Sequence, residues 1–170
     1  MLMKLVALGS NLPHPEYGSP QAVLEQVIAC LPDYDIKLVQ QSRWYATKPV
    51  PVSDQPDFVN GVIEVAYDGT ADALLSTLHE IEARFGRVRG VINAARIIDL
   101  DLIDFDNQTS EAGTGGPVLP HPRMHERRFV LRPLCDFAPD WQHPKLAQTA
   151  AELLQGLPSA DEGDTVALSE

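Results

Sequence analysis

Apolar residues follow two regular spacings along the first 105 residues. Continuous or alternating apolar runs predict strands, whereas apolar residues three and four positions apart predict helices. The predicted order is strand, helix, strand, strand, helix, strand, over residues 2–8, 21–31, 36–45, 58–67, 71–85 and 97–105. Thr70 is placed to cap the second helix, and Gly86 follows its end. Residues 9–11 read as a turn after the first strand.

This element order predicts an α+β fold of the ferredoxin-like kind, in which helices pack on one face of an antiparallel sheet. A doubly wound parallel sheet is disfavoured, because residues 36–45 and 58–67 are joined by a proline-rich loop and not by a helix. The segments 47–56 and 87–95 are long loops, which suit an active site.

The last third of the chain is less regular. Residues 107–117 form a polar loop, 127–137 are apolar enough to be partly buried, and 146–154 predict a short helix. For a chain of 170 residues we expect one catalytic domain, over residues 1–155. Residues 156–170 predict an acidic tail that is partly disordered.

The net charge and the positions of the arginines indicate which kinds of ligand the chain can bind. The formal net charge of −11 argues against nonspecific binding to nucleic acid or to an anionic membrane. Eight of the nine arginines nevertheless fall between Arg84 and Arg132, which predicts a local anion, unless they only balance nearby acids. Cys30 and Cys135 form no CxxC pair and no signal-peptide pattern is present, so we expect a reducing, cytoplasmic location.

The strongest chemical signal is the pair Asp99 and Asp101 inside a predicted strand. Strand alternation turns both carboxylates to one face, and it turns Ile98, Leu100 and Leu102 to the other. Two charges about 6.6 Å apart repel by about 2.5 kcal/mol at an effective dielectric of about 20, so the presence of both carboxylates in one strand requires an explanation. Full solvation of the two carboxylates is one explanation. The other is a divalent cation, because carboxylates suit Mg²⁺, which usually accompanies substrate phosphates.

The loop at residues 86–90 holds Arg87 and Arg89 between two glycines, shortly before the aspartate strand. Guanidinium groups match phosphate oxygens, and the glycines leave the loop free to close over a ligand. Neither a P-loop nor a kinase glycine-rich loop is present, so ATP would be held through metal and arginines, including Arg96. A surface loop with incidental charge is the alternative.

Two smaller patterns complete the candidates. His121 lies between two prolines and near Arg127, and zinc binding with His125 is disfavoured because a proline opposes a helix through both histidines. Phe58 and Asn60 share a predicted strand face, where a ring could stack on a planar heterocycle and an amide could bind its edge. Taken singly, His121 is equally well explained by a structural role, and Phe58 and Asn60 are better explained by one.

Together these segments resemble the 6-hydroxymethyl-7,8-dihydropterin pyrophosphokinase family of folate biosynthesis. The matching stretches keep the family's order and spacing, and they are residues 7–12, 54–60, 86–89, 95–102, 120–121 and 127–131. The resemblance implies a ferredoxin-like enzyme that transfers the β,γ-diphosphate of ATP to the pterin hydroxymethyl oxygen and releases AMP. One departure is that residues 93–95, Asn-Ala-Ala, stand where the family often has Trp-Gly-Pro.

The resemblance also implies roles for individual residues. Two Mg²⁺ ions would lie on Asp99 and Asp101, and the catalytic set would add Arg87 and Arg96. ATP would contact Glu82, Arg89, Arg96, Leu102, His121 and Arg127. The pterin would lie between two phenylalanine rings, and its contacts would be Gly9, Thr47, Lys48, Val50, Phe58, Asn60 and Phe129.

Two other functions stay open at this point. A metal-dependent nucleotidyltransferase also pairs a Gly-Ser turn with an Asp-x-Asp strand, although in that class the two lie close in sequence. A catalytically inactive relative that only binds the ligands is the second, because the loop at 93–95 is altered. In each case the expected partners are small molecules, with no nucleic acid and no membrane, and we expect a monomer.

Overall fold

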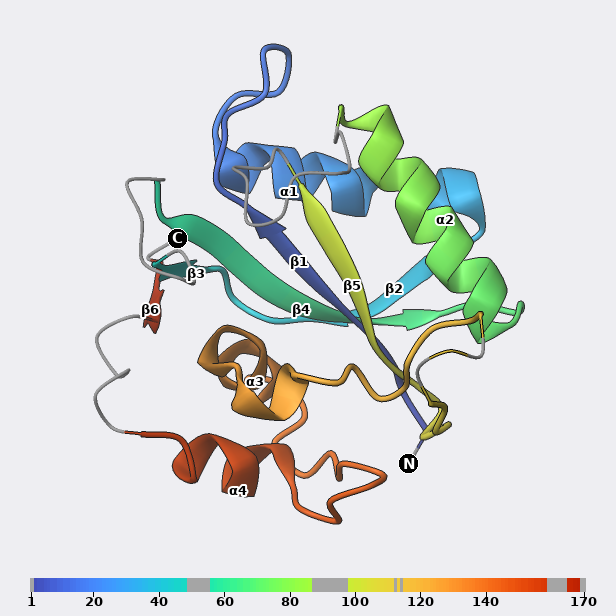
Figure 1. Ribbon diagram of the computed structural model, residues 1–170. Coiled ribbons are helices and arrows are strands. Elements are labelled where there is room, and N and C mark those ends of the chain that lie inside the picture. Colours follow the sequence, from blue (N-terminus) through green and yellow to red (C-terminus); the bar gives the residue numbers. More distant parts are fainter. Residues whose placement is uncertain are drawn as a thin grey trace.

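The computed structural model describes residues 2–48, 56–86, 98–111, 113, 115–158 and 165–168. Within them, one antiparallel sheet has the strand order β5-β1-β4-β3-β6, and β2 pairs with β4 beside this path. The strands are β1 (Lys4–Ser10), β2 (Lys37–Gln41), β3 (Tyr45–Thr47), β4 (Phe58–Ala66), β5 (Asp99–Phe105) and β6 (Thr165–Ala167). The first strand therefore lies inside the sheet, between β5 and β4 (Figure 1).

Helices cover both faces of this sheet (Figure 1). One face carries α1 (Pro20–Cys30) and α2 (Ala71–Arg84), and the other carries α3 (Arg128–Leu134) and α4 (Ala150–Gln155). Two 3-10 turns are η1 (Leu31–Tyr34) and η2 (Met124–Glu126). The prediction of helices on one face only is wrong, because the apolar segment near residue 130 forms a helix that packs on the second face. No helix in the described ranges is both long enough and apolar enough to cross a bilayer.

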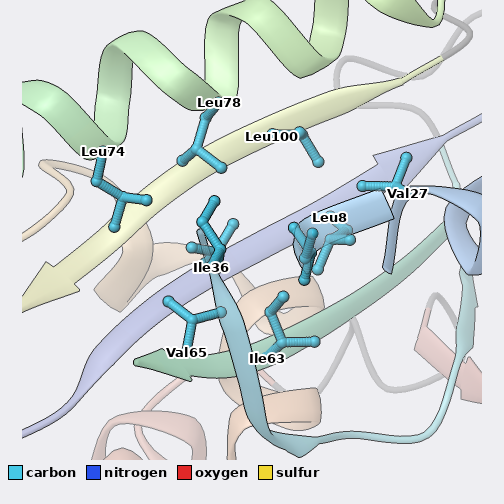
Figure 2. A pocket seen from close by; sticks show the side chains of 10 residues that line it. Leu8, Val27, Ile36, Ile63, Val65, Leu74, Leu78 and Leu100 are labelled. Atoms are coloured by element: carbon cyan, nitrogen blue, oxygen red, sulfur yellow. The ribbon is translucent and has the colours of Figure 1, made fainter. Parts of the chain in front are cut away.

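The first face is closed by an apolar core. In Figure 2, Leu74 and Leu78 of α2 point toward side chains of the strands, among them Leu8, Ile63 and Leu100. These side chains surround a cavity of about 10 Å³ with an entirely apolar lining. A cavity of this size holds at most one water molecule, and an apolar one stays dry. This face therefore contributes packing and offers no polar group to a ligand at the cavity.

A bulge in β5 shapes the second face. The pairing of β5 with β1 skips Ile103, so one extra residue is accommodated at that point. As a result, Ile103 packs in the apolar core that includes α3 and α4. Asp104 faces the same core, where its Oδ2 accepts a hydrogen bond from Trp141 Nε1 at 3.0 Å. Burial raises the pKa of the Asp104 carboxyl, and the indole hydrogen bond opposes this shift. This end of the second face is consequently closed.

The predicted strand over residues 36–45 is two strands, β2 and β3, with a bend between them. At the bend, the Ser42 side chain accepts a hydrogen bond from the Val62 N–H at 3.0 Å. The Trp44 ring packs over Gly61, where a Cβ would lie 2.7 Å from the ring. The side chains of the bend are thus held against β4, and only the flanking residues continue the ladder.

Three further segments differ from the sequence prediction. Gly9 and Ser10, predicted as a turn, continue β1 because they pair with β4. Residues 146–154 are helical only in their second half, where Thr149 caps the first turn. Within the predicted acidic tail, residues 165–167 form β6 on the edge of β3. Each difference comes from a contact with a distant part of the chain or from a cap.

Candidate active site

Asp99 and Asp101 lie half-buried on β5. Asp99 is directly opposite Gly9 of β1, and Asp101 is directly opposite Ala7. Ala7 packs against the apolar core between the sheet and the helices α3 and α4, which we call the second core. The residues that alternate with the two aspartates are buried in the apolar core between the sheet and the helices α1 and α2, which we call the first core. They are Ile98, Leu100 and Leu102. The predicted alternation is confirmed, and both carboxylates belong to the second face.

The neighbours of this aspartate pair on β1 are small residues. Gly9 has no side chain and Ala7 has only a methyl group, so neither puts a bulky side chain beside the carboxylates. Two carboxylates on one face suit Mg²⁺, which takes its other ligands from water and phosphate oxygens. No group of three or more His, Cys, Asp or Glu side chains that could hold a metal occurs within the described ranges. By its donor chemistry, the pair could hold a metal that also binds a phosphate-bearing substrate.

Gly9 is needed because the side chain of Asn60 lies over it. A Cβ at position 9 would be 2.7 Å from Asn60 Oδ1 and 3.8 Å from Phe58 Cδ1. Asn60 pairs with Gly9 on one side, and Asp99 pairs with it on the other. Adjacent strands are about 4.8 Å apart, so the Asn60 and Asp99 Cα atoms are roughly 10 Å apart. An amide and a carboxylate pair thus share one face at the separation of a small ligand.

The Asn60 side chain is held by Thr47. Asn60 Nδ2 donates a hydrogen bond to Thr47 Oγ1, and both side chains are buried. Thr47 lies opposite Phe58 on β3, and β6 pairs with the same residue on the outer edge. The hydrogen bond fixes the amide so that Oδ1 is directed toward Gly9. The resemblance implied a role for Thr47, but its side-chain contact to Asn60 was not predicted.

His121 lies against β5 near the aspartate pair. Its backbone N–H donates to the Ile103 carbonyl at 2.9 Å, and its ring Nδ1 accepts from the Arg123 N–H at 3.1 Å. Burial, followed by the charge of Arg127, lowers the pKa of His121 to about 4, while Asp99 opposes the shift. The imidazole is therefore neutral near pH 7 and carries its proton on Nε2. It can donate a hydrogen bond to an anion without changing its charge.

Arg127 and Phe129 stand at the start of α3. The guanidinium carbon of Arg127 lies 5.3 Å from the centroid of the Phe129 ring. The Phe129 ring packs against the second core and stays half-buried. Arg127 thus lies over the Phe129 ring, and its charge contributes to the lowered pKa of His121.

Glu82 and Leu102 lie on the α2 side of β5, away from the aspartate carboxylates. The Glu82 side chain is 1% exposed, and its Oε2 accepts a hydrogen bond from the Leu100 N–H at 2.9 Å. Leu102 is 5% exposed and belongs to the first core. The carboxylate of Glu82 is thus engaged with the backbone of the aspartate strand, a contact that the sequence did not predict.

Four predicted site residues lie outside the described residues, namely Val50, Arg87, Arg89 and Arg96. Residues 93–95 also lie outside them. Lys48 follows β3 and is exposed. Of the candidates on the described strands, six lie on one sheet face, namely Gly9, Thr47, Phe58, Asn60, Asp99 and Asp101.

Comparison with known proteins points to one family. The sequence model described as 7,8-dihydro-6-hydroxymethylpterin-pyrophosphokinase (HPPK) matches residues 5–139. The chain is similar to 2-amino-4-hydroxy-6-hydroxymethyldihydropteridine pyrophosphokinase of Pseudomonas aeruginosa, with 38% identity over 159 residues, 90% of each chain. The protein of the same name from a Synechocystis species is 34% identical over 152 residues, which are 89% of this chain and 74% of that one.

Some relatives are much longer than this chain. It is 36% identical over 124 residues to the folic acid synthesis protein of Schizosaccharomyces pombe, covering 73% of its own length and 17% of that protein. The crystal structure of Plasmodium falciparum HPPK-DHPS with pteroate matches with a TM-score of 0.67 and 13% identity, over 91% of this chain and 42% of that one. At that identity the match shows a shared fold.

Proposed function

The chain belongs to the 7,8-dihydro-6-hydroxymethylpterin-pyrophosphokinase family, and we propose that it transfers diphosphate from ATP to 6-hydroxymethyl-7,8-dihydropterin. The products are AMP and the pterin diphosphate, in folate biosynthesis. The observation that carries the proposal is the row of Asp99, Gly9 and Asn60 across three strands. In this proposal the carboxylate pair would bind metal and the amide beside it would bind the heterocycle.

The second face supports the phosphate half of the reaction. Asp99 and Asp101 would hold the Mg²⁺ that accompanies ATP, two ions in this proposal, and the metal would neutralise charge on the transferred group. Transfer of a phosphoryl group depends on alignment and charge neutralisation more than on covalent chemistry. His121 would donate its Nε2 proton in a hydrogen bond to a phosphate oxygen, and Arg127 would add a fixed positive charge.

The remaining nucleotide contacts rest on the family resemblance. Arg87 and Arg96 would belong to the catalytic set, and Arg89 would contact ATP, all three by position in the sequence. Leu102 and Glu82 would lie toward the nucleoside. Because guanidinium groups bind phosphate oxygens bidentately, the arginines suit a triphosphate that a metal also touches.

The pterin would lie beside Gly9, over which the side chain of Asn60 extends. Asn60 Oδ1, held in place by Thr47, would accept a hydrogen bond from the ring edge. Phe58 and Phe129 would stack on the two ring faces, and Thr47, Lys48 and Val50 would supply further contacts. The hydroxymethyl oxygen would then be directed toward the carboxylate pair in the same row.

The proposal extends to the architecture and setting of the chain. The strand order and the βαββαβ succession support a ferredoxin-like arrangement over residues 4–105. We assign residues 1–155 to one catalytic domain and 156–170 to a tail that contributes β6. The protein would act as a monomer on small molecules, and its composition suggests a cytoplasmic location.

The test is the identity of the products. With Mg²⁺, ATP and the hydroxymethyl dihydropterin, we expect AMP in a one-to-one ratio with pterin diphosphate, followed by chromatography of both. Release of inorganic diphosphate with a nucleotidylated product would indicate nucleotidyl transfer. Binding of both substrates without AMP would indicate an inactive relative.

A further inference from the structure

Glu82 makes a contact that connects α2 to the aspartate strand. Its Oε2 accepts a hydrogen bond from the backbone N–H of Leu100 at 2.9 Å. Leu100 is the residue between Asp99 and Asp101, and its side chain is buried in the first core. The hydrogen bond therefore acts on the peptide that separates the two carboxylates.

The position of β5 explains why such an acceptor is needed. β5 stands at the end of the sheet path, and β1 is the only strand that pairs with it among the described residues. An edge strand presents backbone N–H groups that no neighbouring strand can satisfy, and a buried unsatisfied N–H costs about 1–3 kcal/mol. Glu82 supplies the missing acceptor from the last turns of α2.

The burial of Glu82 makes the contact more than incidental. The side chain is 1% exposed, and a carboxylate is rarely buried unless hydrogen bonds stabilise it. Hydrogen bonds to an ionised acceptor are roughly twice as strong as neutral ones. Because successive side chains alternate in a strand, any rotation of the Leu100 peptide would redirect both flanking carboxylates.

We propose that Glu82 is a positioning residue, which holds the Leu100 peptide so that Asp99 and Asp101 present a fixed pair of carboxylates to the metal. This role rests on the proposed function. It differs from a nucleoside contact, because Glu82 then acts through the backbone of β5 and touches neither ATP nor metal. A displacement of about 1 Å at a reacting centre can cost about 100-fold in rate, so a single anchor of this kind is sufficient to matter.

The matched variants are Glu82→Met and Glu82→Gln. Methionine keeps the length of the side chain and removes the acceptor, whereas glutamine keeps one acceptor oxygen and removes the charge. Glu80→Met, an exposed position on the same helix, is the control. Circular dichroism establishes that each variant is folded before any binding is measured.

The first readout needs no substrate. In the wild type we expect the Leu100 amide to exchange with deuterium slowly, and in Glu82→Met at least about tenfold faster, with Glu82→Gln and Glu80→Met close to wild type. A rapidly exchanging Leu100 amide in the wild type would overturn the proposal, even if Glu82→Met did not fold.

The second readout is calorimetric binding of a non-hydrolysable ATP analogue at graded Mg²⁺ concentrations. We expect Glu82→Met to need about tenfold more Mg²⁺ for half-saturation, with pterin affinity unchanged and with rescue in Glu82→Gln. Unchanged Mg²⁺ dependence in folded Glu82→Met would overturn the positioning role alone. If Glu82→Met and Glu82→Gln lost nucleotide affinity equally at every Mg²⁺ concentration, the positioning role would be overturned in favour of a direct nucleoside contact. A wild type that binds no nucleotide would overturn the proposed function as well.

Discussion

The two faces of the sheet are made from the same strands and serve different purposes. On the first face, Leu8, Ile63 and Leu100 pack against α1 and α2 and leave a cavity of only about 10 Å³. On the second face, packing against α3 and α4 occupies one end, and the other end carries Gly9, Asn60 and the aspartate pair. We refer to the first face, which is filled by apolar side chains, as the closed face, and to the second, which carries these polar side chains, as the open face.

This difference shows how a stable core can hold an unfavourable arrangement of charges. β5 contributes Leu100 and Leu102 to the closed face and Asp99 and Asp101 to the open one. Burying each leucine stabilises the fold by about 1.5–3 kcal/mol, which offsets the roughly 2.5 kcal/mol repulsion of two neighbouring carboxylates. The backbone that carries the site is thus fixed from behind by residues next to it in sequence.

The largest effect is expected on the open face. Changing Asp101 to Asn, or Asp99 to Asn, should lower turnover by about 100-fold or more, because each change removes a charged metal ligand. The melting temperature establishes that each variant is folded. The measurement is steady-state release of AMP, together with thermal unfolding.

Asp106→Asn is the matched control for this change. Asp106 follows the same strand and pairs with Lys4 at 2.9 Å, at the other end of β5. Partly exposed ion pairs contribute about 0–1 kcal/mol, so turnover should stay within about twofold of wild type. Near-normal turnover in both site variants would refute the metal assignment.

The next effect is expected on the closed face and in stability. Leu74 of α2 is fully buried beside the small cavity, and Leu74→Ala should lower the free energy of unfolding by about 2–5 kcal/mol. Turnover per folded molecule should be unchanged. Urea unfolding measures the first quantity, and Leu146→Ala, at a 45% exposed leucine, is the control. Reduced turnover in fully folded Leu74→Ala would show that the two faces are not separable.

A smaller and more selective effect is expected at the amide. Asn60→Ala should raise the KM for the pterin about tenfold and leave the KM for ATP within about threefold, since one hydrogen bond to the ring is lost. Thr47→Val, which removes the acceptor of the Asn60 amide, should shift the same constant less. Equal weakening of both substrates would place Asn60 away from the pterin.

The parts of this comparison that sequence reasoning predicted depend on local geometry. The orientation of Asp99 and Asp101 follows from a period of two within one strand, and it needs no knowledge of the neighbouring strands. The cap of α2 is equally local, because Thr70 Oγ1 accepts the Ala73 N–H at 3.1 Å only three residues away. Such features could be read from the sequence with their residue numbers.

The missed parts depend on pairing between distant residues. Thr47 meets Asn60 through the register of β3 and β4, and no pattern within either segment encodes that register. The helix α3 begins without a side-chain cap and contains Pro133, so its local signal is weak, and its apolar contact with the second face stabilises it. The contact of Glu82 with the Leu100 N–H is a further case, because the sequence alone does not distinguish a buried glutamate from an exposed one.

The smallest expected effect concerns His121, whose neutral ring distinguishes the open face from an ordinary cluster of cations. Burial and Arg127 lower its pKa to about 4 in the folded state, against an ordinary value near 6.5. The unfolded chain therefore binds more protons between these values, so stability falls as pH decreases from 6.5 toward 4 and is unaffected by His121 above 6.5. We expect the His121 ring to titrate near pH 4 in NMR spectra. We also expect His121→Asn to leave the shape of the activity profile between pH 6 and 8 unchanged while lowering its height. A His121 midpoint near 6.5 would mean that the ring becomes a cation in this range, and the neutral-donor role would be wrong.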